Sequence, residues 1–107
     1  MVTKNIFWGF PGPMMGEMSE TLLNTQHFRL ERIISSGQMT PPGEWFDQES
    51  NEWVVLLSGN AGLLFEGETE VCVMRPGDYV QIPAHRRHRV EWTDREQKTV
   101  WLALHYQ

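Results

Sequence analysis

The chain has 107 residues, the size of one small domain, which leaves little room for a second hydrophobic core. Its formal net charge of −5 argues against nucleic acid as a partner, because that binding requires a basic surface. The chain has no apolar stretch suited to a signal sequence or a membrane span, so we expect a cytoplasmic protein without a membrane partner.

Residues 1–27 are expected to form an N-terminal segment outside the main domain. Glycines and prolines interrupt residues 1–18, and their apolar run NIFWGF is expected to pack on its own domain or on a partner. The following stretch SETLLNTQ predicts a short helix, which Ser19 would cap. Glu20 suits the positive end of that helix's dipole.

From residue 28 to residue 107, short apolar runs alternate with turn residues. The runs are FRLERIIS, EWVVLLS, AGLLFEG, TEVCVM, DYVQIP, HRVEW and TVWLALHY. None of them holds a helical period over two turns, and segments such as GN, GE and RPGD separate them. The pattern predicts an all-β domain, built as a small barrel or sandwich.

Alternation along three of these runs places one polar residue among apolar neighbours on the same strand face. The groups that share a face are Glu52 with Val54 and Leu56, His88 with Val90 and Trp92, and His105 with Trp101 and Ala103. Because the inward faces of a barrel converge, Glu52, His88 and His105 are expected to meet inside it.

Two stretches resemble the two sequence motifs of the cupin superfamily. GDYVQIPAHRRH resembles the second motif, with Gly77, Pro83 and the metal-binding histidine His88 at the family's spacings. EWVVLLSG resembles the end of the first motif, a Glu, six further residues and a Gly, here Glu52 and Gly59.

The chain also departs from the cupin pattern at three places. The usual His-x-His before the Glu is missing, since WFDQ, residues 45–48, occupies those positions. His85 takes the place of a Gly, and Trp92 takes the place of an Asn.

The resemblance implies a jelly-roll β-barrel with a divalent metal in its mouth, usually held by three His and one Glu. Carried over by position, Glu52 and His88 remain, and Asp47 stands where one His is missing. The fourth ligand is left open among Gln48, water and His105. Zn, Fe, Mn or Ni would suit such a set. The alternative is a barrel in which these groups only hydrogen-bond to one another.

Three further positions complete the predicted site. His85, at the rim, is predicted to be a general acid–base, with a plain turn residue as the alternative. Trp92 and Trp101, together with Gln48, are predicted to line a partly apolar pocket for a small organic molecule.

Two functions therefore remain open. One is a metal-dependent enzyme acting on a small-molecule ligand, with the reaction unspecified. The other is a non-catalytic module that holds a metal or a small molecule for sensing or storage, which the missing His-x-His favours. The resemblance also implies a homodimer.

Overall fold

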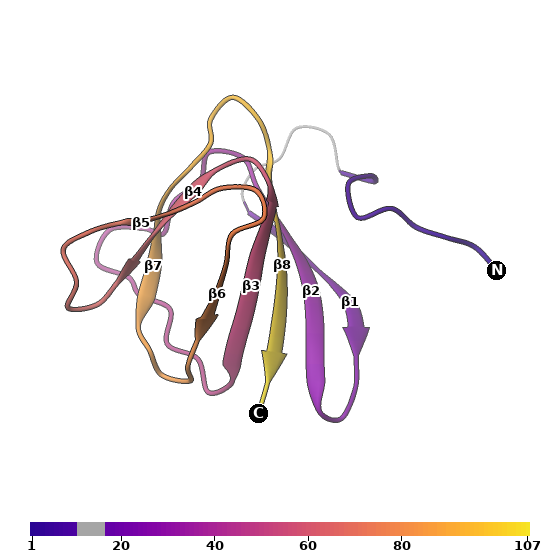
Figure 1. The fold of residues 1–107 in the computed structure, drawn as a ribbon, viewed down its shortest axis with the longest axis horizontal. Helices are drawn as coiled ribbons and strands as arrows, with labels where there is room; N and C mark the ends of the chain where they lie inside the picture. Colours follow the sequence, from indigo (N-terminus) through magenta and orange to yellow (C-terminus); the bar gives the residue numbers. More distant parts are fainter. Residues whose placement is uncertain (11–16) are drawn as a thin grey trace.

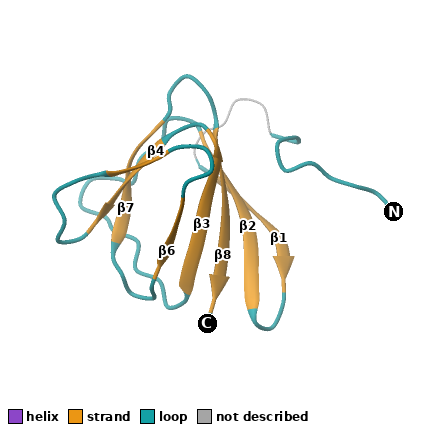
Figure 2. Ribbon diagram, in the orientation of Figure 1, coloured by secondary structure: helices purple, strands orange, loops and turns teal. Residues whose placement is uncertain are grey.

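The computed structural model describes residues 1–10 and 17–107. This part of the chain forms eight β-strands (Figure 1): β1 (Met18–Asn24), β2 (Phe28–Ser35), β3 (Asn51–Ser58), β4 (Ala61–Phe65), β5 (Cys72–Met74), β6 (Tyr79–Ile82), β7 (His88–Thr93) and β8 (Thr99–Tyr106). Figure 2 shows strands and loops but no helix in the same residues. The all-β prediction is confirmed.

The strands form two antiparallel sheets. One has five strands in the order β1-β2-β8-β3-β6, and the other has three in the order β5-β4-β7. The hydrophobic core lies between them and is made by Val54, Leu56, Ala61, Leu63, Met74, Ile82, Trp101 and Ala103. All of these side chains are buried, and the predicted inward faces of β3 and β8 are confirmed.

The predicted N-terminal helix is wrong. Residues 18–24 form β1, which pairs with β2 from Met18 opposite Ile34 to Asn24 opposite Arg29. The next residues make the hairpin turn, because the Thr25 hydroxyl accepts hydrogen bonds from the backbone N–H groups of residues 27 and 28, both at 3.1 Å. A helix of two turns has little stability of its own. Pairing with the long strand β2 supplies backbone hydrogen bonds that such a helix would have to make alone.

A bulge in β7 overturns the predicted face of Trp92. Residues Leu63 and Gly62 of β4 pair with Val90 and Trp92, so Glu91 is an extra residue without a partner in β4. An extra residue reverses the alternation beyond it. Trp92 is consequently 39% exposed, whereas His88, before the bulge, is 5% exposed.

Candidate functional site

A cavity of about 150 Å³ lies between the two sheets. An engineered protein cavity of about this volume holds a benzene molecule. Its lining comes from both sheets, from the loop before β3 and from the start of β1: Glu17, Ser19, Glu31, Ile33, Phe46, Gln48, Glu52, Val54, Leu63, Ile82, His88, Val90, Trp101 and His105. The cavity therefore combines apolar walls with a small set of titratable side chains, as ligand sites commonly do.

Three predicted site residues meet in this cavity. Glu52 comes from β3, His88 from β7 and His105 from β8, and all three are at most 7% exposed. Glu52 lies directly opposite His105 in the pairing of β3 with β8. Alternation on each strand and the closing of the two sheets bring them together.

His88 presents one ring nitrogen to Glu52. Its Nδ1 lies 2.8 Å from the backbone oxygen of Arg86, and because a carbonyl only accepts, Nδ1 carries the proton and donates. In the neutral ring, Nε2 then holds a free lone pair, 3.9 Å from Glu52 Oε1. A donor bond of this kind from the second ring nitrogen orients metal-binding histidines in proteins.

Glu52 is the unusual member of the site. Its Oε1 is buried and has no hydrogen-bond partner among the described residues. Burial raises the pKa of this carboxyl above its usual value, while His105 and His88 partly offset the increase. A buried carboxylate oxygen without a partner is costly, so this position favours a cation, a proton or a donor group of a ligand.

Two glutamates of the cavity, Glu17 and Glu31, were not among the predicted site residues. Glu31 lies on β2, where its Oε1 is 2.7 Å from His105 Nε2, and its other oxygen is 3.9 Å from Arg29 Nε. Alternation in FRLERIIS could have placed Glu31 on an inward face. No sequence pattern indicated Glu17, because the stretch after it was predicted as a helix and the start of β1 was therefore not recognised. Burial also raises the pKa of Glu17, with an opposing contribution from the Ser35 hydroxyl at 3.4 Å.

The remaining predicted residues divide between the cavity and the surface. Gln48 and Trp101 line the cavity, and the Trp101 indole N–H donates to Ser35 Oγ at 3.2 Å. Asp47 does not line it: this carboxylate is exposed and lies 2.8 Å from His85 Nδ1. The backbone of Phe46 pairs with His88, and with a period of two this turns Phe46 and Gln48 inward and Asp47 outward.

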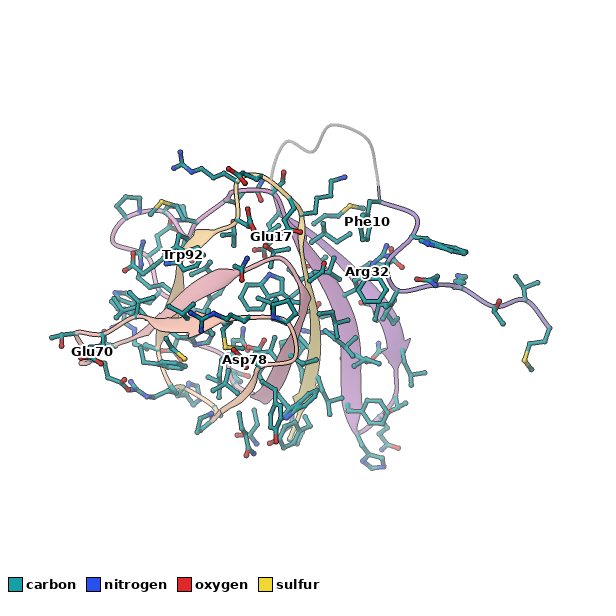
Figure 3. The ribbon with its side chains drawn as sticks, turned by 45° about the horizontal axis from the view of Figure 1, so that its top comes forward. Phe10, Glu17, Arg32, Glu70, Asp78 and Trp92 are labelled. Carbon is teal, nitrogen blue, oxygen red and sulfur yellow. The ribbon has the colours of Figure 1, made fainter. Side chains whose placement is uncertain are left out.

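His85 and Trp92 also lie away from the cavity lining. The His85 side chain is 65% exposed. The backbone φ of His85 is 63°, in the left-handed region that Gly adopts most easily, and the cupin motif usually has a Gly at this position. Its backbone N–H donates to the oxygen of Gln48 at 2.7 Å, which ties the β6–β7 turn to the loop before β3. Trp92 lies on the three-stranded sheet, far from Phe10 and Arg32 at the opposite side of the molecule (Figure 3).

Within residues 1–10 and 17–107, no group of three or more His, Cys, Asp or Glu side chains is arranged to hold a metal ion. The described site offers the pair His88 and Glu52, beside a second pair formed by His105 and Glu31.

The two sheets and the cavity between them define a small β-barrel protein. The chain belongs to the cupin family: residues 32–105 match the family described as Cupin domain. Its fold is the all-β double-stranded β-helix, shared with an RmlC-like cupin family protein from Methanocaldococcus jannaschii (18% identity, 99% of this chain and 92% of that chain, TM-score 0.70).

Two further solved structures are similar to the chain. A protein from Ralstonia eutropha JMP134, named a "putative mannose-6-phosphate isomerase", is 47% identical over 99% of this chain and 98% of its own, with a TM-score of 0.94. A cupin superfamily protein from Desulfitobacterium hafniense DCB-2 is 14% identical over 91% of this chain and 83% of its own, with a TM-score of 0.73. No curated protein matches the chain.

None of the described residues belongs to a helix of the length and apolar character needed to cross a membrane.

Proposed function

We propose that this cupin binds a divalent metal in its cavity, with His88 Nε2 and Glu52 Oε1 as ligands, and acts on a small organic molecule there. The observation that carries the proposal is Glu52 Oε1, which has no hydrogen-bond partner among the described residues and lies 3.9 Å from the unprotonated ring nitrogen of His88. A cation bound by both atoms would compensate the buried charge. Zn, Fe, Mn or Ni would suit this mixed nitrogen and oxygen set.

His105 is the candidate for a third ligand. It lies beside Glu52 in the sheet, and its Nε2 contacts Glu31. To bind a metal it would have to exchange that contact. Gln48 offers a neutral amide oxygen at the same cavity, whereas Asp47 faces away.

A bound divalent metal would polarise an oxygen atom of the ligand. The chain's own contribution is the Glu31–His105 pair: with His105 in contact with Glu31 and outside the ligand set, the pair can hold and move a proton at His105 Nε2 inside the cavity. Trp101, Val54 and Leu63 would hold the apolar part of the ligand and exclude water. The exposed His85 is better suited to the turn that it stabilises than to proton transfer.

The name of the Ralstonia protein suggests sugar isomerisation, which needs a group that moves protons. We extend the proposal to a neutral, hydroxyl-bearing ligand rather than a phosphorylated one. Three carboxylates line the cavity but no Lys or Arg among the described residues does, and Arg29 is engaged with Glu31. A phosphate group in the cavity would be repelled by these carboxylates, and no lysine or arginine side chain among the lining residues would bind it.

The second candidate is a non-catalytic binding module. The observation that favours it is the lack of a three-ligand group in the described residues. Ligand binding without turnover in the metal-loaded protein would support this function over the enzyme.

Metal titration by calorimetry of the untagged, chelator-treated chain tests the proposal. We expect close to one metal per chain, with affinity reduced about 10- to 100-fold or more in His88→Ala and Glu52→Gln, because each removes a ligand. Asp47→Ala and His85→Ala serve as matched controls and should bind like the unmodified chain. Equal losses in Asp47→Ala, or no binding by the unmodified chain to any of the four metals, would contradict the proposal.

A further inference from the structure

Gln48 brings a neutral amide to the cavity lining. Its side chain is half-buried and has no hydrogen-bond partner within residues 1–10 and 17–107. The same holds for Glu52 Oε1, which belongs to the same lining and whose residue is 7% exposed. Polar groups that line a cavity without a partner of the chain are groups that a ligand can satisfy.

Backbone hydrogen bonds fix the inward direction of Gln48. Two residues earlier, Phe46 N–H donates to His88 O at 2.7 Å, and His88 N–H donates to Phe46 O at 3.2 Å. Gln48 O itself accepts from His85 N–H at 2.7 Å. Since residues 46 and 48 lie on one face of this extended segment, the amide is held at the cavity before any ligand arrives.

Other N–H groups of the lining are already engaged. His105 Nε2 contacts Glu31 at 2.7 Å, and the Trp101 indole N–H donates to a side-chain hydroxyl at 3.2 Å. Ser19, on the edge strand β1, offers a hydroxyl at an exposed position. Gln48 is therefore the described lining residue whose N–H donors remain available to a ligand inside the cavity.

The chemistry of an amide suits an organic ligand better than the proposed metal. An amide oxygen is a hard, neutral donor that fits Mg or Ca better than Zn, Fe or Ni. Metal binding through this oxygen would also leave the two N–H donors of Gln48 unused. His88 and Glu52 already supply the donor atoms that those transition metals prefer.

The amide also defines what it can bind. It presents a donor and an acceptor side by side in one plane. The complementary group is a carbonyl beside a hydroxyl on the adjacent carbon, because it presents an acceptor and a donor in the same way. Glutamine forms a matched pair of hydrogen bonds of this kind with the adjacent acceptor and donor of adenine.

The size and charge of the cavity suit a small neutral molecule with this group. Its volume of about 150 Å³ is that of a cavity that holds benzene, and a three-carbon hydroxyketone is no larger. Glu17, Glu31 and Glu52 would repel an anionic ligand. The apolar side chains of Val54 and Trp101 can pack against the carbon atoms of such a molecule.

We propose that Gln48 is the specificity-determining residue of the cavity, and that the ligand is a small neutral α-hydroxycarbonyl compound whose adjacent carbonyl and hydroxyl groups hydrogen-bond to its amide. This ligand class rests on the proposed function, because it is assigned to the same cavity. Gln48 thereby binds the organic ligand and lies outside the metal's ligand set.

Titration of the isotope-labelled, chelator-treated chain with hydroxyacetone, followed by NMR, tests the ligand class. The indole N–H signal of Trp101, which lines the cavity, should shift, whereas that of Trp92, outside it, should not. Two matched compounds serve as controls: butan-2-one has a methyl group in place of the hydroxyl, and propane-1,2-diol has a hydroxyl in place of the carbonyl. Each should bind about tenfold more weakly, as expected for the loss of a hydrogen bond to the amide.

Substitution of Gln48 tests its role. Gln48→Leu removes both the donor and the acceptor, so hydroxyacetone should bind about tenfold more weakly and butan-2-one at least as tightly as hydroxyacetone. Asp47→Leu is the matched control, since the Asp47 side chain is 47% exposed and outside the lining, and it should bind like the unmodified chain. Circular dichroism shows whether the variants fold. If Gln48→Leu does not, Gln48→Glu decides, because it keeps the shape and lacks the N–H donors.

Metal titration by calorimetry separates this proposal from the metal site. Gln48→Leu should bind metal as tightly as the unmodified chain, and a loss of metal affinity would make Gln48 a metal ligand and overturn its assignment. A chain that binds metal but binds hydroxyacetone no better than butan-2-one would overturn the ligand class and leave the metal site standing. Hydroxyacetone binding that depends on Gln48 in a chain without metal affinity would support the ligand class and contradict the metal site alone.

Discussion

Glu52 is a residue whose burial lowers the stability of the fold at the candidate site. Its neighbours on the inward face of β3, Val54 and Leu56, are core residues, and an apolar side chain at position 52 would continue that pattern. The chain instead buries a carboxyl group, one oxygen of which has no hydrogen-bond partner in residues 1–10 and 17–107. Such groups lower stability, and proteins retain them mainly where they bind or react.

The raised pKa of Glu52 has a definite sign for stability. The folded chain binds this proton more tightly than the unfolded chain, whose carboxyl titrates near the usual value of 4.5. The stabilising contribution is therefore complete below that value, and is lost as the pH rises through the higher folded pKa.

Glu52→Gln should therefore stabilise the metal-free protein at neutral pH. The variant resembles the protonated form, so its Tm should exceed that of the unmodified chain by a few degrees at pH 7. In a domain of this size, 1 kcal/mol in the free energy of unfolding shifts the Tm by about 4–8 °C. The gain should disappear near pH 4. Thermal unfolding with a chelator from pH 4 to pH 8 measures it, with the exposed Glu70→Gln as control. A Tm difference between Glu52→Gln and the unmodified chain that is smaller at pH 7 than at pH 4 would refute this account.

At the scale of the element, the β3–β4 turn depends on Gly59. Its φ is +83°, and a Cβ there would lie 2.6 Å from Thr99 Cα and 2.9 Å from Lys98 O. Both are backbone atoms of the segment that begins β8, so they cannot move aside without shifting a central strand. The glycine is required by the backbone conformation and by the close approach of β8.

Gly59→Ala should destabilise the chain by more than the cost of a left-handed alanine. That cost is about 1–2 kcal/mol, and steric overlap should add about 1–3 kcal/mol. Gly67→Ala separates the two contributions, because Gly67 also has a positive φ, +89°, but nothing within 4 Å of the added Cβ. Urea unfolding of both variants measures the difference. Equal losses in the two variants would show that β8 yields to the extra atom.

The β7 bulge is an element-scale feature with a consequence for the site. It keeps His88 and Val90 at the cavity and turns Trp92 outward, over Gly62, where any side chain would overlap with the indole. Of the two tryptophans predicted to line the cavity, Trp101 therefore does so and Trp92 does not.

At the scale of the whole molecule, the two sheets have different surroundings. The cavity lies between them, and the outer face of the five-stranded sheet points away from it. The resemblance to cupins implies a homodimer. In a homodimer, unfolding is coupled to dissociation, and stability depends on protein concentration.

The Tm of the unmodified chain should therefore rise with protein concentration. A 100-fold increase shifts a linked binding equilibrium by up to about 2.7 kcal/mol, so a rise of several degrees is expected. Differential scanning calorimetry at several concentrations measures this rise, and a constant Tm would argue against coupled dissociation.

Much of the fold could be predicted from the sequence by itself, because the period of a strand is a local property. Glu52 on β3 and His105 on β8 share faces with core residues at i+2 or i−2, and this pattern placed both inside before any contact was known. The spacing from Gly77 through Pro83 to His88 likewise predicted the second motif of the cupin family, to which the chain belongs.

Only the tertiary structure decided the rest, because it depends on pairings between distant segments. The bridge between Phe46 and His88 turned Gln48 rather than Asp47 inward, and pairing with β2 made a strand of the stretch predicted as a helix. The bulge opposite β4 turned Trp92 outward. Each outcome depends on backbone hydrogen bonds to another part of the chain, and these bonds cannot be predicted from a local sequence pattern.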